Sequence, residues 1–187
     1  DATTGGALVF GAGGTAIAGN ASLDAGGPVT QSGALDVGGD ATLSAGSQPV
    51  TLADSTNRVG GLFKLTTTGN ASIAGHFGDG DFNTGALEFG QTRVDRLTKV
   101  TAGGPVTQSG ALTFSGTSTL DAGTNGITLA DAHNDFVGLL SVTGGATTLR
   151  DANDLTVALT TGATKLTTGG SLNVSGSAAS LDATTGG

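Results

Sequence analysis

Few residues in this 187-residue sequence carry side chains suited to catalysis or metal binding. Histidine occurs twice, at His76 and His133, and neither lies in a spacing typical of metal ligands. The segment around His133 (DAHND, residues 131–135) matches DSTNR at residues 54–58, which has no histidine. We therefore interpret both segments as loops. Because cysteine is absent, disulfides, thiolate catalysis and cysteine-based metal sites are excluded.

A candidate calcium site lies at residues 78–83 (GDGDFN), which is similar to half of a calcium-binding nonapeptide with Asp79 and Asp81 as ligands. Such sites share each ion between successive copies, and this segment occurs once. A turn at a corner is the simpler interpretation, and whether Asp79 and Asp81 bind calcium stays open at this point.

Acid–base catalysis would need carboxylates that converge on one face. Asp36 and Glu88 take the outward position of two similar strands, but three other copies of that strand carry Thr113, Asn173 and Val9 there. We therefore predict that the chain is not an enzyme and has no catalytic residue, cofactor-binding residue or metal ligand. The alternatives are a β-helical enzyme that acts on polysaccharides and a solenoid that binds ice or calcium.

The elements that would position these side chains are short strands. A Gly-small-Leu-x-Phe/Val pattern begins at Gly6, Gly33, Gly85, Gly110 and Gly170. Its two apolar side chains have period 2 and point to one face, which predicts strands of about 4–6 residues. Clusters of Gly, Asn, Asp and Ser between the strands are typical of corners. The 35 glycines and the lack of a 3.6-residue period argue against helices.

Longer repeats indicate how the strands are arranged. The decapeptide GGPVTQSGAL occurs at residues 26–35 and again at 103–112, and similarity continues beyond it at the same offset of 77. This pattern predicts an internal duplication of about 24–100 and 101–176 within one solenoid segment that covers 1–187. Because the hexapeptide DATTGG stands at 1–6 and at 182–187, we interpret the chain as a window of a longer repetitive protein.

Many short strands fit either a β-sandwich or a β-solenoid. Only in a solenoid does each coil lie on a near copy of itself, so that the same small residue must fit the same corner repeatedly. We therefore predict an all-β fold, a parallel β-solenoid with about 20–30 residues per coil and about 6–9 coils. The core is expected to contain Leu, Val, Ile, Ala and most of the seven Phe residues.

Composition limits the partners. The formal net charge is −8 and the pI is about 4.3, so that nucleic acid would be repelled. Apolar runs are much shorter than the roughly 20 residues of a membrane helix, which predicts no membrane insertion. Threonine pairs suggest an ice-binding face, but their spacing in the sequence is uneven, whereas ice binding needs even spacing.

Two runs resemble a known family. Residues 109–157 (SGALTFSGTSTLDAG and onward) and 169–187 (GGSLNVSGSAASLDATTGG) resemble the repeat regions of large bacterial surface exoproteins, both filamentous haemagglutinin-like proteins of two-partner secretion and giant autotransporter adhesins. The resemblance covers essentially the whole chain. It implies a right-handed parallel β-helix that is exported across an outer membrane.

These observations together predict a structural and adhesive function. We expect a shaft or filament segment at the bacterial cell surface, outside the cell, that supports attachment to surfaces, to other cells or to biofilm matrix. The expected partners are neighbouring coils or copies of the same protein, through end-to-end or covalent continuation, and host or bacterial cell-surface glycans or proteins. No cofactor is expected.

Overall fold

The computed structural model describes residues 1–186, which form 21 strands and contain no helix. Every paired strand is parallel to its neighbour. The described residues accordingly include no helix that could span a bilayer.

The strands are β1 (Ala2–Thr4), β2 (Leu8–Phe10), β3 (Thr15–Ile17), β4 (Ala21–Ala25), β5 (Val29–Gln31), β6 (Leu35–Val37), β7 (Ala41–Ser44), β8 (Val50–Leu52), β9 (Arg58–Thr66), β10 (Ala71–Thr84), β11 (Leu87–Val94), β12 (Thr98–Ala102), β13 (Val106–Gln108), β14 (Leu112–Phe114), β15 (Ser118–Asp121), β16 (Ile127–Leu129), β17 (Asp135–Phe136), β18 (Leu140–Gly144), β19 (Thr147–Asp151), β20 (Leu155–Thr168) and β21 (Leu172–Thr185).

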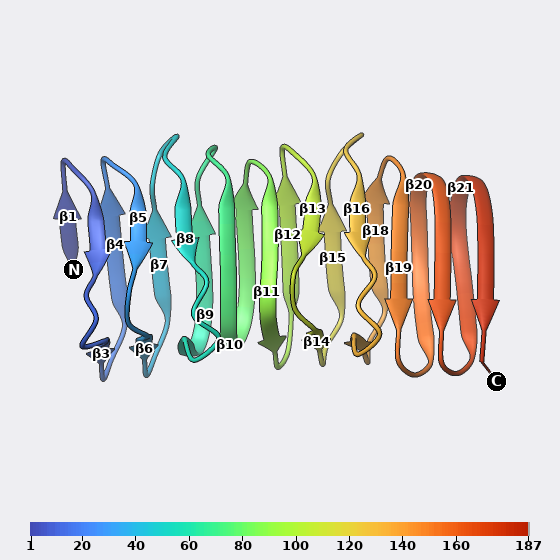
Figure 1. Ribbon diagram of the computed structural model, residues 1–187, viewed down its shortest axis with the longest axis horizontal. Helices are drawn as coiled ribbons and strands as arrows, with labels where there is room; N and C mark the ends of the chain where they lie inside the picture. The colour runs from blue at the N-terminus through green and yellow to red at the C-terminus, as the bar shows by residue number, and fades with distance from the viewer. Residues whose placement is uncertain (187) are drawn as a thin grey trace.

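The strands stack along the axis of a rod (Figure 1) and form three ladders, which we call faces A, B and C. Face A contains β1, β4, β7, β12, β15 and β18, and face B contains β2, β5, β8, β13, β16 and β19. Face C is a shorter ladder built from β3, β6, β14 and β17. The long strands β9, β10, β11, β20 and β21 bend around corners and contribute to more than one face. The predicted parallel β-solenoid is confirmed.

The rod has about ten coils of roughly 19 residues, so that the coils are shorter and more numerous than predicted. Along face A the successive register partners are Leu23, Leu43, Leu65, Phe82 and Val100, followed by Leu120, Val142, Leu159 and Gly176. In both halves of this series, two wide coils are followed by two narrow ones. Four coils, two wide and two narrow, therefore make up the offset of 77, since Val100 takes the place of Leu23 in the second half.

The narrow coils explain the difference from the predicted coil length. In β10 and β20 one strand continues for 14 residues around a corner, whereas the wide coils spend extra residues on turns such as 45–48 and 122–126. Those turns need glycine, because Gly46 and Gly123 have φ values of 55° and 58°. The two glycines differ by the same offset of 77 and open equivalent turns.

The repeated sequence patterns do not mark a single face. Leu8 and Leu87 of the Gly-small-Leu pattern lie on face B, whereas Leu35 and Leu112 lie on face C. The two DATTGG hexapeptides also differ in position, since Thr3 pairs with Asp24 on face A and Asp182 pairs with Lys165 on face B. Every strand that follows a corner needs small residues and a similar backbone conformation at its start. Similar sequences therefore occur on different faces.

The core is a narrow apolar column, as predicted, and all seven Phe side chains are buried in it. Six of them form a continuous series of tilted and edge-to-face contacts with ring centroids 5.0–6.1 Å apart. Such contacts stabilise aromatic pairs by about 0.5–1.5 kcal/mol beyond the burial of their area. The series passes through the narrow coils and ties them to the wide coils on the C-terminal side; its members are Phe63, Phe77, Phe82, Phe89, Phe114 and Phe136.

A pair of side-chain amides, one buried (Asn57) and one partly buried (Gln31), gives the repeated decapeptide its structural meaning. Gln31 Nε2 donates to Asn57 Oδ1 (2.8 Å), and Asn57 Nδ2 donates to Gln31 Oε1 (2.9 Å). Asn57 also accepts from the backbone N–H of Leu35 and donates to the carbonyl of Leu52. This pair with its two bonds to leucine backbones, which we call the amide clamp, recurs at the offset of 77 between Gln108 and Asn134.

Candidate functional site

Most of the basic side chains lie in one stretch of the rod. Five of the seven Lys and Arg residues, together with one of the two histidines, fall between residues 58 and 99, around the narrow coils of the first four-coil unit. The sequence presents these charges as scattered, and coiling brings them together. We call them the charged belt; its basic members are Arg58, Lys64, His76, Arg93, Arg96 and Lys99.

On face C the belt has basic side chains in three successive coils. Arg58, His76 and Arg93 follow one another in register, and Asp36 precedes them 3.7 Å from the Arg58 guanidinium. Asp95 closes the group, because its carboxylate lies 2.7 Å from His76 Nε2 and accepts a hydrogen bond from Arg93 Nε at 2.8 Å. Partial burial raises the pKa of Asp95, but the bonds from Arg93 and His76 outweigh burial and hold that pKa below its usual value.

Asp79, one of the two candidate calcium ligands, is already paired with a cation. Arg96 donates to both of its carboxylate oxygens (2.8–3.2 Å), and the backbone N–H of Leu97 donates to Oδ1 at 3.0 Å. The hydrogen bonds from Arg96 are the main cause of the lowered pKa of Asp79. Asp81 lies in register between Lys64 and Lys99. Positive side chains thus occupy the surroundings where a calcium ion would need further oxygen ligands.

Within residues 1–186, which the structure describes, no group of three or more His, Asp or Glu side chains could hold a metal ion. Asp79 and Asp81 therefore have no third ligand of these types beside them. His133 contacts Asp131, with Nδ1 3.1 Å from Oδ1, in an exposed turn. Hydrogen bonds from the His133 backbone and ring lower the pKa of Asp131. Asn134, the next residue, turns inward to the amide clamp.

The two carboxylates considered for acid–base chemistry lie on different sides of the rod. Asp36 belongs to face C and contacts Arg58, whereas Glu88 belongs to face B. Both point outward, as predicted. Their separation gives no converging pair, and the geometry resembles a surface ladder more than a catalytic cleft.

The outward positions of face A form two rows of mainly hydroxyl side chains. Thr42 and Ser44, and likewise Ser141 and Thr143, show the two rows in wide coils. Coiling therefore evens out threonine positions that are uneven in the sequence. The charged residues Lys64, Asp81 and Lys99 occupy one of these rows in the centre of the rod and interrupt it.

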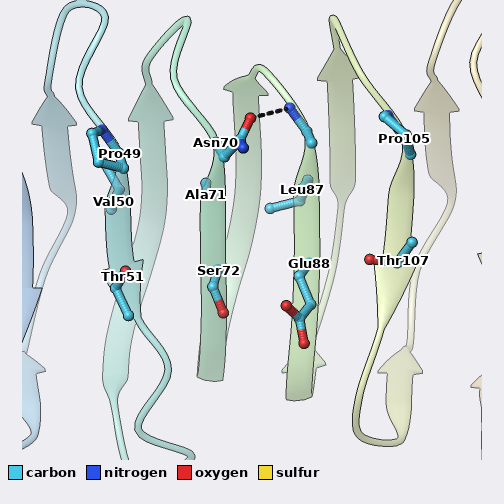
Figure 2. A pocket seen from close by; sticks show the side chains of 11 residues that line it. Pro49, Val50, Thr51, Asn70, Ala71, Ser72, Leu87, Glu88, Pro105 and Thr107 are labelled. Atoms are coloured by element: carbon cyan, nitrogen blue, oxygen red, sulfur yellow. Dashed lines mark hydrogen bonds between the residues drawn. The ribbon is translucent and has the colours of Figure 1, made fainter.

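Face B contains a shallow groove of about 270 Å³ between residues 49 and 107 (Figure 2). The rings of Pro49 and Pro105 frame it, and Asn70 and Ala86 occupy the equivalent corner positions of the two coils between them. Asn70 accepts a hydrogen bond from the backbone N–H of Ala86 at 3.3 Å. The groove arises where two small corners lie between two proline corners.

Arg150 points outward near the end of β19 on face B. A neighbouring row of outward side chains runs along the whole rod, and we call it the face B row. It has one member in each of coils 1 to 10, and we number the coils by it. Glu88 and Lys165 are four coils apart in this row and make no ion pair within residues 1–186. In order, the members are Val9, Thr30, Thr51, Ser72, Glu88, Thr107, Thr128, Thr148, Lys165 and Asp182.

A family model described as "Repeats of unknown function (DUF5649)" matches residues 1–66 and 68–143. The chain belongs to the DUF5649 repeat family. No curated protein and no solved structure matches it. The two DUF5649 matches end at 66 and at 143, which is the same offset of 77 that the four-coil unit has in the structure.

Four coils further along the rod, face B has an equivalent groove. It has a volume of about 370 Å³ and is lined by Thr128, Ala146, Thr148, Ala163 and Lys165, among others. At the offset of 77, Ala163 corresponds to Ala86 of the first groove and Lys165 corresponds to Glu88. The two grooves therefore have the same position in the coil, while Lys165 takes the place of Glu88 and Asp182 is added to the lining of the second groove.

Sequence reasoning missed two features of this DUF5649 chain, the charged belt and the paired grooves. The belt could not be seen because its ladder partners, such as Arg58, His76 and Arg93, are separated by narrow coils that are shorter than predicted. The grooves depend on which coils carry proline at one corner position. Once the coil length is known, aligning residues 58, 76 and 93 reveals the basic side chains of the belt, and aligning residues 49, 70, 86 and 105 reveals the corners that shape the first groove.

Proposed function

We propose that these DUF5649 repeats form a shaft segment of an exported bacterial surface protein that attaches cells to surfaces, to other cells or to matrix. The observation that carries the proposal is the four-coil unit. It occurs twice in succession with the same order of wide and narrow coils. A rod of this kind can be lengthened by adding units, which is what a protein that displays a binding region away from the cell requires.

The surface chemistry supports this proposal. The chain carries a net charge of −8, and its outward rows consist largely of Thr, Ser and Asp side chains. Like-charged rods repel one another at a distance and stay soluble. The resemblance of residues 109–157 and 169–187 to exoprotein repeats supports export and adhesion. Contacts would be made with further coils, with copies of the protein, and with cell-surface glycans or proteins.

The first experiment tests location. An antibody against residues 1–187 is applied to intact and to permeabilised cells of the bacterium that produces the protein, with an antibody against a cytosolic protein as the control. We expect labelling of intact cells by the first antibody alone. Labelling that appears only after permeabilisation would contradict a surface function.

The second experiment tests the shaft and attachment separately. Electron microscopy and fibre diffraction of the native protein should show a rod with an axial repeat of about 4.8 Å. Cells that lack the gene should attach less well to surfaces or to one another than cells with the restored gene. A rod without any attachment defect would support a shaft but contradict adhesion, whereas a compact particle would contradict the shaft.

A further inference from the structure

The two face B grooves have the same position in the coil but differ in charge, because Glu88 lines the first groove, whereas Lys165 and Asp182 line the second. Lys165 occupies the position in the second groove that is equivalent to that of Glu88 in the first. If both grooves bound the same ligand, the part of the ligand that contacts the Glu88 carboxylate in one groove would have to contact the Lys165 ammonium group in the other. One chemical group would not bind both equally well. Repetition of a groove in which this one position reverses its charge instead suits a surface that is complementary to itself.

From this geometry we propose that face B is the contact surface of an antiparallel dimer of this chain. A two-fold axis through Thr128 in coil 7, parallel to the strands, places coil 5 of one copy opposite coil 9 of the other. Glu88 of each copy then faces Lys165 of the second copy. Both ion pairs form at once, because a two-fold interface repeats every contact.

The remaining positions of the row fit the same axis. Thr107 in coil 6 lies opposite Thr148 in coil 8, so that hydroxyl groups face each other. Asp182 in coil 10 lies opposite Ser72 in coil 4, whose hydroxyl can donate to the carboxylate. The dimer brings no two charges of the same sign in the face B row directly opposite each other.

The corner positions are also complementary. Pro105 projects at the edge of the first groove, in coil 6. Under the same axis it lies opposite the corner of coil 8, where the small residue Ala146 lines the second groove. The proline ring of each copy can therefore enter the second groove of the other copy.

The size of the contact sets its expected strength. Coils 4 to 10 overlap, which gives a surface about 34 Å long and about 16 Å wide at the usual strand and coil spacings. Both copies together would bury roughly 1,000 Å², at the lower limit for a specific interface. We therefore expect a dimer that dissociates on dilution and is weakened by salt.

Charge reversal tests the ion pairs. Sedimentation velocity is measured over a concentration series for the full chain and for Glu88→Lys, Lys165→Glu and the double variant. Each single variant puts like charges opposite each other twice, so we expect dissociation constants raised roughly tenfold or more, and the double variant should restore dimerisation. Lys99→Glu is the matched control, because it makes the same charge change as Lys165→Glu on face A, and we expect it to leave the dimer unchanged.

Crosslinking tests the axis, and the absence of cysteine makes single-cysteine variants unambiguous. In Thr128→Cys the two introduced thiols face each other, so that a short bis-maleimide should join the copies. The exposed Thr30 in the same row is the control, because two Thr30→Cys thiols would be about ten coils, or ~48 Å, apart. A parallel pair of rods shifted by four coils also pairs Glu88 with Lys165 but holds the Thr128 positions about 19 Å apart.

Three results would overturn the proposal. The first is a chain that stays monomeric at all accessible concentrations, and the second is a dimer unaffected by the single charge reversals. The third is crosslinking at Thr30→Cys but not at Thr128→Cys. A monomer that binds an oligosaccharide, with binding lost in Glu88→Gln, would assign the face to a glycan instead. The proposal does not depend on export or adhesion, so those tests can fail independently.

Discussion

Asn57 and Asn134 are polar residues in an apolar column, and each lies one coil after a leucine at the same ladder position. Their side chains satisfy the backbone where the chain passes from face B to face C. Within residues 1–186, no buried side-chain nitrogen or oxygen atom lacks a hydrogen-bond partner. The clamp thus makes two buried amides compatible with the core and specifies which coils lie next to each other.

Removing one side chain of the amide clamp should lower the free energy of unfolding. Asn57→Ala removes the partner of the Gln31 side-chain oxygen and of several buried backbone groups, while Gln31 Nε2 keeps its bond to the Gly33 carbonyl, so that we expect a loss of about 2–4 kcal/mol in the free energy of unfolding. The double variant Asn57→Leu with Gln31→Leu should recover part of this loss. Chemical denaturation measures both. Asn20→Ala is the control, since Asn20 is exposed and bonds one backbone N–H; an equal loss in the control would show that the clamp is dispensable.

Asp151 is a buried carboxylate, and its contribution to the stability of the fold should depend on pH. It is 1% exposed, and burial raises its pKa even though the backbone N–H groups of Asn153 and Phe136 donate to it. The folded chain therefore binds this proton more tightly than the unfolded chain. The contribution of Asp151 to stability is fully present below its unfolded pKa of 3.8 and is lost as the pH rises through the higher folded pKa.

Asp151→Asn removes this dependence. Relative to the unmodified chain, the variant should become more stable as the pH rises from 3.8 toward neutrality, as measured by urea denaturation at several pH values. Asp79→Asn should show the opposite trend, because the pKa of Asp79 is lowered and its contribution is lost as the pH falls. A constant difference between Asp151→Asn and the unmodified chain would contradict the assignment.

At the scale of strands and corners, Gly103 and Gly110 of the decapeptide differ in how closely the preceding coil approaches them. A Cβ atom at Gly110 would collide with the backbone nitrogen of Gln91 in the preceding coil, whereas the atom nearest to a Cβ at Gly103 is Thr84 O at 3.7 Å. Neither residue has a positive φ. Close stacking of coils, and not backbone conformation, therefore requires glycine at position 110.

Alanine substitutions separate the two cases. Gly110→Ala should lower the free energy of unfolding by about 1–3 kcal/mol, because the stacked corners must move apart. Gly103→Ala should be neutral or slightly stabilising, since it restricts the unfolded chain without a clash. Thermal denaturation followed by circular dichroism measures both changes. Equal effects at the two positions would show that corner stacking is looser than the structure indicates.

In the rod as a whole, one four-coil unit should be removable. Deleting residues 24–100 joins Leu23 to Thr101, the position that follows Val100 in the same ladder four coils later. We expect a folded rod that is shorter by about 19 Å, measured by small-angle X-ray scattering. Its unfolding transition should stay cooperative.

The matched control leaves a coil incomplete. Deleting residues 24–90 joins face A directly to the chain that leads to face C, so that one coil lacks its face B strand. The strands above and below would lose their hydrogen-bond partners, and we expect aggregation or a large loss of strand signal. A control that folds as well as the four-coil deletion would argue against the coil as the structural unit.

Local sequence was enough to establish the class of fold, because period-2 apolar pairs, frequent corner residues and the duplication leave few alternatives to a parallel solenoid. It also identified Phe10, Phe89 and Phe114 as core residues, since their positions depend only on local alternation. The length of each coil was harder to predict from local sequence. Ser72 pairs with Glu88 in a narrow coil, whereas Asp36 pairs with Arg58 in a wide one, and local sequence does not show where a corner is shortened.

Contacts between side chains of different coils depended on the complete three-dimensional arrangement. His76 approaches Asp95 and Gln31 approaches Asn57, because coiling converts a large sequence separation into a spacing of one coil. The face on which Asp36 and Glu88 lie depends on every corner before them. The reason is physical: alternation within a strand is a local property, whereas register between coils depends on the summed lengths of strands and turns.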